Sequence, residues 1–414
     1  MQLKTILNRV QKIKSFVYGA VRWVEGARSP TLEVELHPRA NSRPGCSGCG
    51  RSGPGYDRLP VRRFEFVPFW GMKVFLVYAP RRVACTRCGV RVEEMPLAEG
   101  KHPVTRTYAW FLASWAKRLS WKEVAEVFQS SWDVVFGAVE MAVAYGREHL
   151  DLSEIQSLGI DEIAWGRGHR YLTVVYQIDA HCKRLLWVGE KRTVKTLLTF
   201  FHWPGPERSA ALRFICSDMW MPYLKVIAKK AGQAIHVLDR FRIMGHFGKA
   251  IDEVRAQEAR ELRARGGEPV LTKTRWLLLK RPGTEKQEVR LADLLPYNLR
   301  SVRSYLLKED FQFFWGYRSP YWAGCFLDRW CMRTMRSKIG PMKRIARTRG
   351  HRPLILNWFR AKGQLSSGVV EGFNAKAKLT TRKAYGFRTY HGLEVALYHA
   401  LGILPEPKFT HRFS

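Results

Sequence analysis

The sequence predicts a multidomain α+β protein with mixed sheets, and three observations support this fold class. Two closely spaced cysteine pairs occur near the N-terminus, a stretch with helical periodicity follows, and a series of short strands and helices begins near residue 155. The chain has 414 residues, of which 46% are apolar and 13% aromatic, so it is not a disordered chain. Its length allows about two to four domains. We divide it into the segments 1–100, 101–150, 151–240, 241–360 and 361–414.

The charge of the chain is strongly positive. There are 70 Lys and Arg against 36 Asp and Glu, which gives a net charge of +34. This excess is unusual for a metabolic enzyme and predicts a polyanionic partner, nucleic acid before membrane. Apolar runs such as 108–116 and 395–404 are shorter than the roughly 18 residues of a spanning helix, so no membrane partner is expected. Residues 3–17 have helical spacing with interspersed Lys and Arg, which predicts a basic helix, no signal peptide and an intracellular protein.

Two cysteine pairs have the spacing of metal ligands, and Gly follows the second cysteine of each pair. A two-residue gap lets both thiolates reach one ion, so two pairs complete a tetrahedral structural Zn²⁺ site. The runs 63–67 and 72–78 between the pairs are strand-like, which predicts a zinc ribbon. Four free thiols or two disulfides are the alternatives, and the other four cysteines are expected in the core. The predicted zinc ligands are Cys46, Cys49, Cys85 and Cys88.

A helix-turn-helix is predicted within residues 101–150. Ser120 and Glu123 have the spacing of a capping box at the start of a short helix. Residues 129–130 form the predicted turn, and a second helix starts at Ser131 and Trp132, which we expect to contact DNA. The second helix is poor in Arg and Lys, so a plain helical linker is the alternative.

From residue 155 onward, strand and helix patterns alternate in an order that defines a topology. Three strands with short gaps predict an antiparallel meander, and two further strands each follow a helix. The order βββαβαβ is that of an RNase H-like core, a mixed sheet with helices on its faces. The predicted strands are 157–160, 171–178, 184–189, 212–217 and 234–238, with helices near 193–202 and 220–231.

Two acidic residues are placed together by this order. Asp161 lies on the first, central strand, and Asp218 closes the fourth strand beside it. Two adjacent carboxylates repel unless a cation joins them, and hard oxygen ligands suit Mg²⁺ or Mn²⁺. Glu162 is expected to point to the opposite sheet face in a structural or supporting role, and Asp179 to be a turn residue. Asp239 closes the fifth strand and is expected to support the site, with direct metal ligation as the alternative.

A third carboxylate is needed to hold two ions, and it is expected on a late helix. The best candidate is Glu371, in a segment from 364 that reads as a capped helix start. Asn374 and Lys378 follow at i+3 and i+7 and share its face, so an amide and a cation lie beside the carboxylate. Lys378, Arg382 and Arg388 extend a basic surface for phosphate. An intrahelical salt-bridge partner is the alternative role for Glu371.

These residues together resemble a known family. The chain looks like a bacterial insertion-sequence transposase of the ISL-three type, one of the Asp-Asp-Glu recombinases, over nearly its whole length. The resemblance implies that Asp161, Asp218 and Glu371 are the catalytic triad, and that Arg242 stands where the family usually has His. It also implies a bacterial, nucleoid-associated protein. The motifs that carry it are the four cysteines, 120–145, 159–162, 169–174, 217–220 with Tyr223, 237–241, 370–374 and 384–388.

The 152 residues between Asp218 and Glu371 are too many for one loop of a compact core. Residues 240–360 read mostly as helices and contain 27 Lys and Arg against 11 Asp and Glu. Five Trp are interleaved with these cations. The resemblance supports a helical insertion here, and its physical interpretation is a basic platform for DNA. A helical subdomain with core Trp and a solvated basic face is the alternative.

The expected function is that of a transposase which binds the terminal inverted repeats of an insertion sequence. Two Mg²⁺ or Mn²⁺ ions are expected to support strand cleavage and transfer of the freed 3′-hydroxyl to target DNA. Pairing of two transposon ends suggests a homodimer or higher homo-oligomer. Two alternatives stay open, a nuclease or resolvase on the same core without strand transfer, and a non-catalytic DNA-binding regulator.

Overall fold

The computed structural model describes residues 3–27, 29–98, 102–166, 168–280, 283–361, 368–384 and 386–408. The chain forms two compact units, one made of Met1–Leu150 with Arg382–Ser414 and the other of Asp151–Thr381. Each unit is described by itself. No helix in the described ranges is long and apolar enough to cross a membrane.

The first unit begins with a short helix and a four-stranded sheet. Helix α1 (Leu3–Val10) packs on a sheet of β1 (Phe16–Trp23), β2 (Thr31–Pro38), β5 (Met72–Tyr78) and β4 (Arg62–Phe69), in the order β1-β2-β5-β4. The basic helix is therefore shorter than the helical spacing of residues 3–17 suggested. Phe16 and Tyr18 are buried while Val17 is exposed, and this period of two belongs to a strand.

A second sheet carries the cysteine pairs. Its strands are β3 (Gly55–Arg58), β6 (Arg81–Cys85) and β7 (Gly89–Val92), in the order β3-β6-β7. The predicted strands at 63–67 and 72–78 are present as β4 and β5, but they pair with each other in the four-stranded sheet. The placement of these two strands in the cysteine-bearing ribbon was therefore wrong. Their alternate residues Phe64, Phe66, Val74, Leu76 and Tyr78 are buried in a separate core.

Helices complete the first unit. The chain forms α2 (Arg106–Ala116), α3 (Trp121–Val127), α4 (Trp132–Glu148) and, after the second unit, α16 (Tyr390–Leu401), which packs on α4. The predicted capping box is confirmed, because Ser120 accepts from the Glu123 N–H and Glu123 accepts from the Ser120 N–H. Gln129 has φ +49°, which turns the chain sharply between α3 and α4. Two helices joined by a short turn are therefore present, and their role as a DNA-binding helix-turn-helix stays a prediction.

The second unit is built on a mixed five-stranded sheet in the order β10-β9-β8-β11-β12. The central strand β8 pairs antiparallel with β9 and parallel with β11, as the predicted order required. Strands β8 and β9 are longer than predicted. The elements are β8 (Ser157–Gly166), β9 (Arg170–Ile178), β10 (Lys183–Glu190), α5 (Val194–His202), α6 (Gly205–Ala210), β11 (Phe214–Ser217), α7 (Met221–Lys230) and β12 (Ile235–Leu238).

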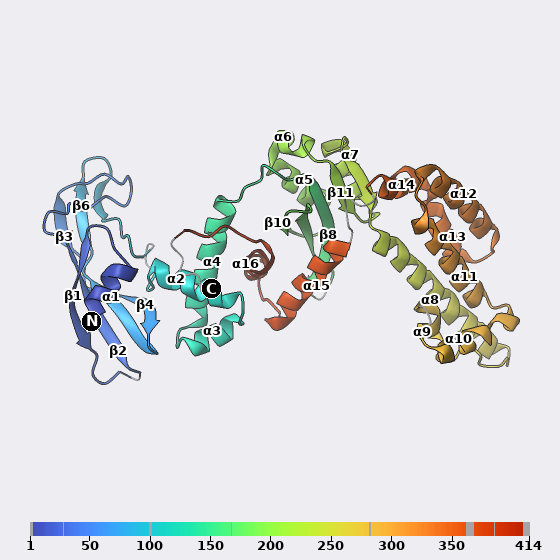
Figure 1. Ribbon diagram of the computed structural model, residues 1–414, viewed down its shortest axis with the longest axis horizontal. Coiled ribbons are helices and arrows are strands. Elements are labelled where there is room, and N and C mark those ends of the chain that lie inside the picture. Colours follow the sequence, from blue (N-terminus) through green and yellow to red (C-terminus); the bar gives the residue numbers. More distant parts are fainter. Residues whose placement is uncertain are drawn as a thin grey trace. The chain divides into compact units, whose positions relative to one another are not determined.

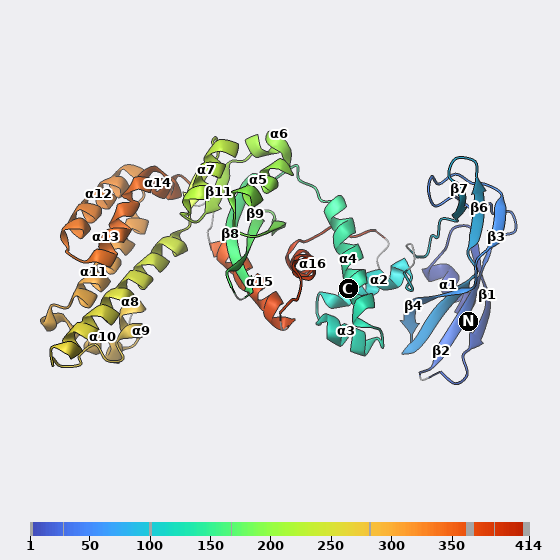
Figure 2. The same cartoon turned by 180° about the vertical axis from the view of Figure 1, so that it is seen from behind.

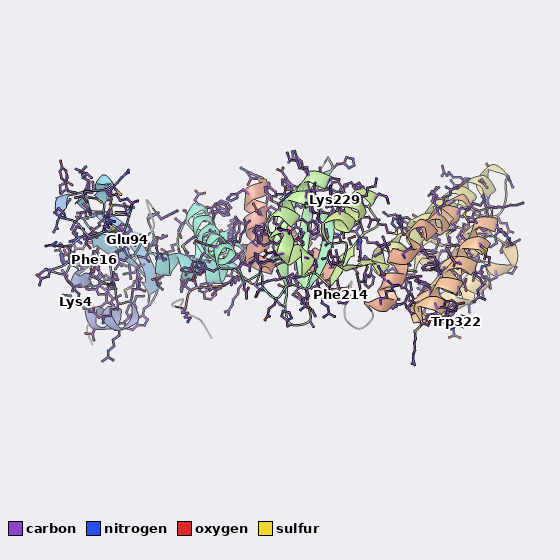
Figure 3. The ribbon with its side chains drawn as sticks, turned by 90° about the horizontal axis from the view of Figure 1, so that it is seen from above. Lys4, Phe16, Glu94, Phe214, Lys229 and Trp322 are labelled. Atoms are coloured by element: carbon purple, nitrogen blue, oxygen red, sulfur yellow. The ribbon has the colours of Figure 1, made fainter. Side chains whose placement is uncertain are left out.

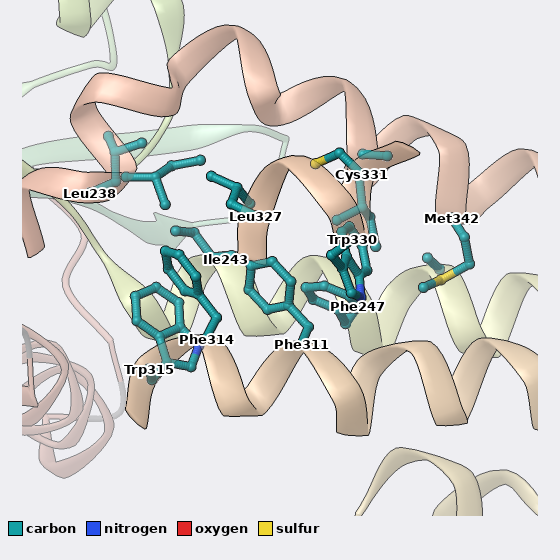
Figure 4. Close-up of a cluster of buried hydrophobic side chains, with 14 of the residues drawn as sticks. Leu238, Ile243, Phe247, Phe311, Phe314, Trp315, Leu327, Trp330, Cys331 and Met342 are labelled. Atoms are coloured by element: carbon teal, nitrogen blue, oxygen red, sulfur yellow. The ribbon is translucent and has the colours of Figure 1, made fainter. Parts of the chain in front are cut away.

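A helical region follows β12 and shares a core with the sheet. Leu238 of β12 packs in the same hydrophobic cluster as Phe247, Phe314 and Trp330 of the helices (Figure 4). The helices are α8 (Arg240–Ala264), α9 (Arg275–Leu279), α10 (Glu285–Ala292), η1 (Leu295–Tyr297), α11 (Arg300–Gln312), η2 (Phe313–Gly316), α12 (Pro320–Arg336), α13 (Gly340–Ala346), η3 (Arg347–His351) and α14 (Arg352–Arg360).

The tryptophans of this helical region divide between core and surface. Trp315 and Trp330 are buried, whereas Trp276 and Trp322 are exposed, the latter on α12 (Figure 3). Trp358 is partly buried against the same core, so core packing explains three of the five tryptophans, and Trp276 is an exposed ring beside cations. Guanidinium and ammonium groups of Arg275 and Lys280 lie 5.3 Å from the Trp276 ring centroid.

Candidate active site

Helix α15 (Gly368–Lys383) lies across β8 in the second unit, as the two opposite views show (Figures 1 and 2). Gly159 of β8 allows this approach, because a Cβ there would come within 2.4 Å of Val370 Cγ2. The Phe373 ring stacks on Tyr176 of β9 with 4.9 Å between centroids. The helix that carries Glu371 is thus fixed on the face of the sheet to which Asp161 points. The helix start predicted from residue 364 lies outside the described residues.

Asp161 is buried, with a side chain that is 5% exposed, and both of its oxygens accept hydrogen bonds. Its Oδ1 accepts from the Glu162 backbone N–H at 2.8 Å and also pairs with the Arg242 guanidinium. Its Oδ2 accepts from Asn374 Nδ2 at 2.5 Å, and Asn374 Oδ1 accepts from the Tyr176 hydroxyl at 3.0 Å. Burial raises the pKa of Asp161, while the Arg242 charge opposes that shift.

Asp218 follows β11 beside Asp161, because β11 and β8 pair in parallel with Cys216 opposite Gly159. Its Oδ1 accepts from the Trp220 N–H at 3.0 Å. Arg192 Nη2 lies 3.5 Å from Asp218 Oδ2 and 2.9 Å from Glu162 Oε1, so one guanidinium joins the two acids. The same guanidinium stacks 4.2 Å from the Trp220 ring centroid.

Glu162 therefore faces Arg192, while Asp161 faces Arg242 and Asn374, as expected for consecutive residues of a strand. Burial and the nearby Asp218 charge raise the pKa of Glu162 to about 7. In the described part of the chain, Glu162 Oε2 and Arg192 Nε are buried without a hydrogen-bond partner. Unsatisfied buried groups of this kind call for a functional explanation.

Asp239 and Glu371 complete the acidic patch. Asp239 caps α8, since its Oδ1 accepts from the Phe241 N–H at 2.8 Å. Burial first, and then the charges of Asp161 and Glu371, raise the pKa of Asp239 to about 6. Glu371 itself is exposed on α15. We call Asp161, Glu162, Asp218, Asp239 and Glu371 the acidic patch.

The acidic patch has the donor chemistry of a Mg²⁺ or Mn²⁺ site, because it offers hard carboxylate oxygens partly withdrawn from water. Burial first, and then repulsion between neighbouring carboxylates, raises the pKa values of Glu162 and Asp239, and a divalent cation would relieve that repulsion. No three carboxylates of these described residues have oxygens within 4.8 Å of one another. Across the described ranges, the one group of three or more potential ligands that close together is the cysteine cluster. Arg192 contacts Glu162 and Asp218, and Arg242 contacts Asp161.

The four predicted zinc ligands do come together. The ligand atoms of Cys46, Cys49, Cys85 and Cys88 all lie within 4.8 Å of one another, and the Cys49 and Cys85 sulfurs are 3.6 Å apart. All eight cysteines are free of disulfides. Gly50 and Gly89 have φ +70° and +72°, so the glycines after each pair turn the chain as predicted. The cluster is compatible with a structural zinc site.

The residues predicted to contact DNA have different surroundings. Ser131 caps α4 by accepting from the Val134 N–H, and Trp132 is exposed and stacks on Phe136 with 5.2 Å between centroids. Lys378, Arg382 and Arg388 are all exposed, the first two on α15. These cations are accessible to a polyanion, while the Ser131 hydroxyl is already engaged within the protein.

Comparison with known proteins identifies the family of the chain. The model of a transposase family of the ISL-three type matches residues 158–397, a range that contains the whole acidic patch. The chain belongs to this transposase family. It is 31% identical over 379 residues to the transposase for insertion sequence element IS1001 of Bordetella parapertussis, covering 90% of this chain and 92% of that one. It is also 29% identical over 398 residues to the transposase for IS1557 of Mycobacterium tuberculosis, covering 89% and 87%.

Sequence reasoning about this transposase missed Arg192 entirely. It lies in the loop between β10 and α5, far along the chain from both acids it contacts. Lys191 before it has φ +74°, and its carbonyl accepts from the Thr173 hydroxyl, which fixes the loop. One sequence signal could have indicated Arg192: it is a cation between the end of a predicted strand and Thr193, which caps the next helix. Tyr176, the partner of Asn374, was missed because it lies within the apolar run of β9 and nothing in the sequence links it to Asn374.

Proposed function

We propose that this chain cleaves and joins DNA strands at transposon ends with Asp161, Asp218 and Glu371 as its catalytic, metal-holding carboxylates. The observation that carries the proposal is the position of Asp161. It lies on the central strand beside Asp218, and Asn374, one helical turn after Glu371, donates to its carboxylate. Residues from three distant stretches of the sequence thus surround one buried acid.

The sheet order supports an RNase H-like core that begins in residues 151–240, with 241–360 as an insertion. The last part of the core was predicted as 361–414, but only its residues up to 381 group with the sheet. In this proposal residues 1–100 hold the structural Zn²⁺ and residues 101–150 bind DNA through the helix-turn-helix. The tail after residue 381 packs with the first unit. Two copies would be needed to pair two ends, so we propose a homodimer or higher homo-oligomer.

Two divalent ions held by the three carboxylates would activate the attacking oxygen and stabilise the leaving one. The protein's own groups prepare the site. Asn374 and the Glu162 N–H orient Asp161, Asp239 holds the start of α8, and Arg192 holds Asp218. Exposed Lys378, Arg382 and Arg388 would contact phosphates without regard to sequence.

Asp161→Asn and Asp218→Asn test the proposal with little change in shape. Both variants should lose Mg²⁺-dependent cleavage of a DNA carrying the transposon end, while binding that end as tightly as the parent chain. Glu190→Gln, an exposed acid at the end of β10, is the matched control and should cleave normally. Parallel loss of cleavage and binding in the two Asp variants would contradict the assignment.

Strand joining separates the proposal from its rivals. A labelled, pre-cleaved transposon end should become covalently joined to a plasmid in the presence of Mg²⁺. Cleavage without joining would instead identify a nuclease or resolvase on the same core, and metal-independent binding without cleavage would identify a regulator.

A further inference from the structure

The Arg242 guanidinium contacts the carboxylate of Asp161, the central acid of the proposed site. Three groups of the protein donate to the Asp161 carboxylate, and two of them share Oδ1. Asn374 donates to Oδ2, and the Glu162 N–H and the Arg242 guanidinium both donate to Oδ1. The backbone and amide donors are neutral, so Arg242 is the one cation in direct contact with this carboxylate among the described residues. A divalent ion that binds Asp161 through Oδ1 would compete with Arg242 for that oxygen.

Arg242 and Arg192 differ in how firmly they are held. Arg192 contacts two carboxylates, stacks on Trp220 and follows a loop that is fixed by hydrogen bonds. Arg242 lies in the first turn of α8, its side chain is 42% exposed, and it contacts a single carboxylate. Its long side chain can therefore leave Asp161 for solvent without disturbing the helix, whereas Arg192 cannot leave without breaking several contacts.

We propose that Arg242 is an internal counter-ion of the metal-free site, which competes with the divalent ion for Asp161 and raises the metal concentration needed to load the site. This inference rests on the proposed function, because it takes Asp161 as a metal ligand. Two cations beside one buried carboxylate repel each other strongly, so metal binding at Oδ1 includes the work of moving the guanidinium away. The protein thus gains an ordered acidic patch before the metal arrives, at the expense of metal affinity.

The test is the affinity of the full-length chain for Mn²⁺ alone, measured by titration calorimetry at constant ionic strength. Arg242→Gln removes the competing cation and should bind Mn²⁺ on the order of tenfold more tightly. The matched control is Arg240→Gln, which removes the same charge two residues earlier. The Arg240 guanidinium lies over the Trp315 ring at 5.2 Å, so this variant should change Mn²⁺ affinity by less than about twofold.

Thermal unfolding supplies a second measurement that does not depend on calorimetric heats. Without metal, Arg242→Gln should melt at a lower temperature than the parent, because the acidic patch has lost a counter-ion. Saturating Mn²⁺ should raise its melting temperature by more than it raises that of the parent, since tighter binding stabilises more. Equal Mn²⁺ shifts for the two chains, or Mn²⁺ affinity of Arg242→Gln equal to or weaker than the parent's, would overturn the inference.

Asp161→Asn separates failure of the inference from failure of the proposed function. If Asp161→Asn binds Mn²⁺ as the parent does, Asp161 is not a metal ligand and the proposed function itself fails. If Asp161→Asn loses Mn²⁺ binding while Arg242→Gln gains none, the metal site stands and only the competing role of Arg242 is wrong.

Discussion

The cysteine cluster of the first unit and the acidic patch of the second are both candidate metal sites, but they differ in how closely their ligand atoms are placed. The four sulfurs are already gathered within 4.8 Å, on strands and turns that leave little freedom. The carboxylates of the acidic patch are not gathered in this way, because Arg192 and Arg242 contact three of them and Glu371 is exposed on a helix. A closed tetrahedral site suits a permanent structural ion, whereas a working site must admit ions and substrate. In the first unit the potential ligands are therefore already close together, whereas in the second unit most of the carboxylates are bound by other groups of the protein.

The largest effect should come from opening the cysteine cluster. Cys46→Ser removes one buried ligand, and structural zinc contributes on the order of 10 kcal/mol to folding in small domains, so the cysteine-bearing sheet should drop out of the unfolding transition of the first unit. The second unit should keep its own transition, because its core is separate. Differential scanning calorimetry with a zinc assay measures both.

Cys182→Ser is the control for this experiment, since Cys182 is a free thiol in the second unit. It should retain both zinc and the unfolding transition of the first unit. A Cys46→Ser chain that still carries stoichiometric zinc would show that the cysteine cluster is not the zinc site. The contrast with the acidic patch would then no longer hold.

The next effect should come from Arg192. In Arg192→Gln the carboxylates of Glu162 and Asp218 face each other without the cation that joins them, so Asp218 should turn away. We expect cleavage to fall roughly 100-fold, about 3 kcal/mol in barrier, with DNA-end binding unchanged. Arg192→Lys should recover part of the rate, because it restores a charge without the planar fork.

Arg213→Gln provides the matched control for Arg192. Its guanidinium lies over Phe214 at 5.6 Å and bonds Gln156, at the opposite end of β11 from Asp218. Cleavage by this variant should stay near that of the parent. A similar fall in both arginine variants would mean that net charge, and not the bridge between the acids, matters.

These residues also show what sequence could and could not predict. The cysteine pairs, the Ser120–Glu123 capping box and the strand order were predictable, because each depends on signals a few residues apart or on a repeated period. Arg192 was not, since its contacts are made by a loop that sequence alone does not place. The two strands at 63–67 and 72–78 were identified as strands but assigned to the wrong sheet, because the residues of a strand do not indicate which other strand it pairs with.

A smaller effect should follow from Gly159→Ala, which tests whether α15 is held closely on β8. The new Cβ would lie 2.4 Å from Val370 Cγ2, so the helix that carries Glu371 must shift. Overpacking of this kind costs about 2 kcal/mol, which urea denaturation of the second unit would measure. The double variant Gly159→Ala/Val370→Ala should recover much of the loss by making room.

Gly372→Ala is the control, because nothing lies within 4 Å of its would-be Cβ on the same helix. It should be neutral or stabilise α15 by up to about 1 kcal/mol. If Gly159→Ala were as harmless as Gly372→Ala, α15 would not be pressed on the sheet, and Asp161 and Glu371 would be less closely linked than we propose.

The smallest effect is a loss of stability of the second unit when the pH is lowered. Burial lowers the pKa of His236 on β12 to about 4, and its Nε2 lies 2.8 Å from the hydroxyl of Ser217, the residue before Asp218. An unfolded His has a pKa near 6.5, so the unfolded chain binds more protons between pH 6.5 and 4, and stability falls as pH is lowered through that window. At pH 5.5 the loss should be roughly 1 kcal/mol relative to neutral pH.

His236→Gln keeps a nitrogen near Ser217 but does not titrate. The free energy of unfolding of the second unit, measured by denaturation between pH 7 and 5, should therefore depend less steeply on pH in this variant. An unchanged slope would mean that acid weakens the second unit through other groups.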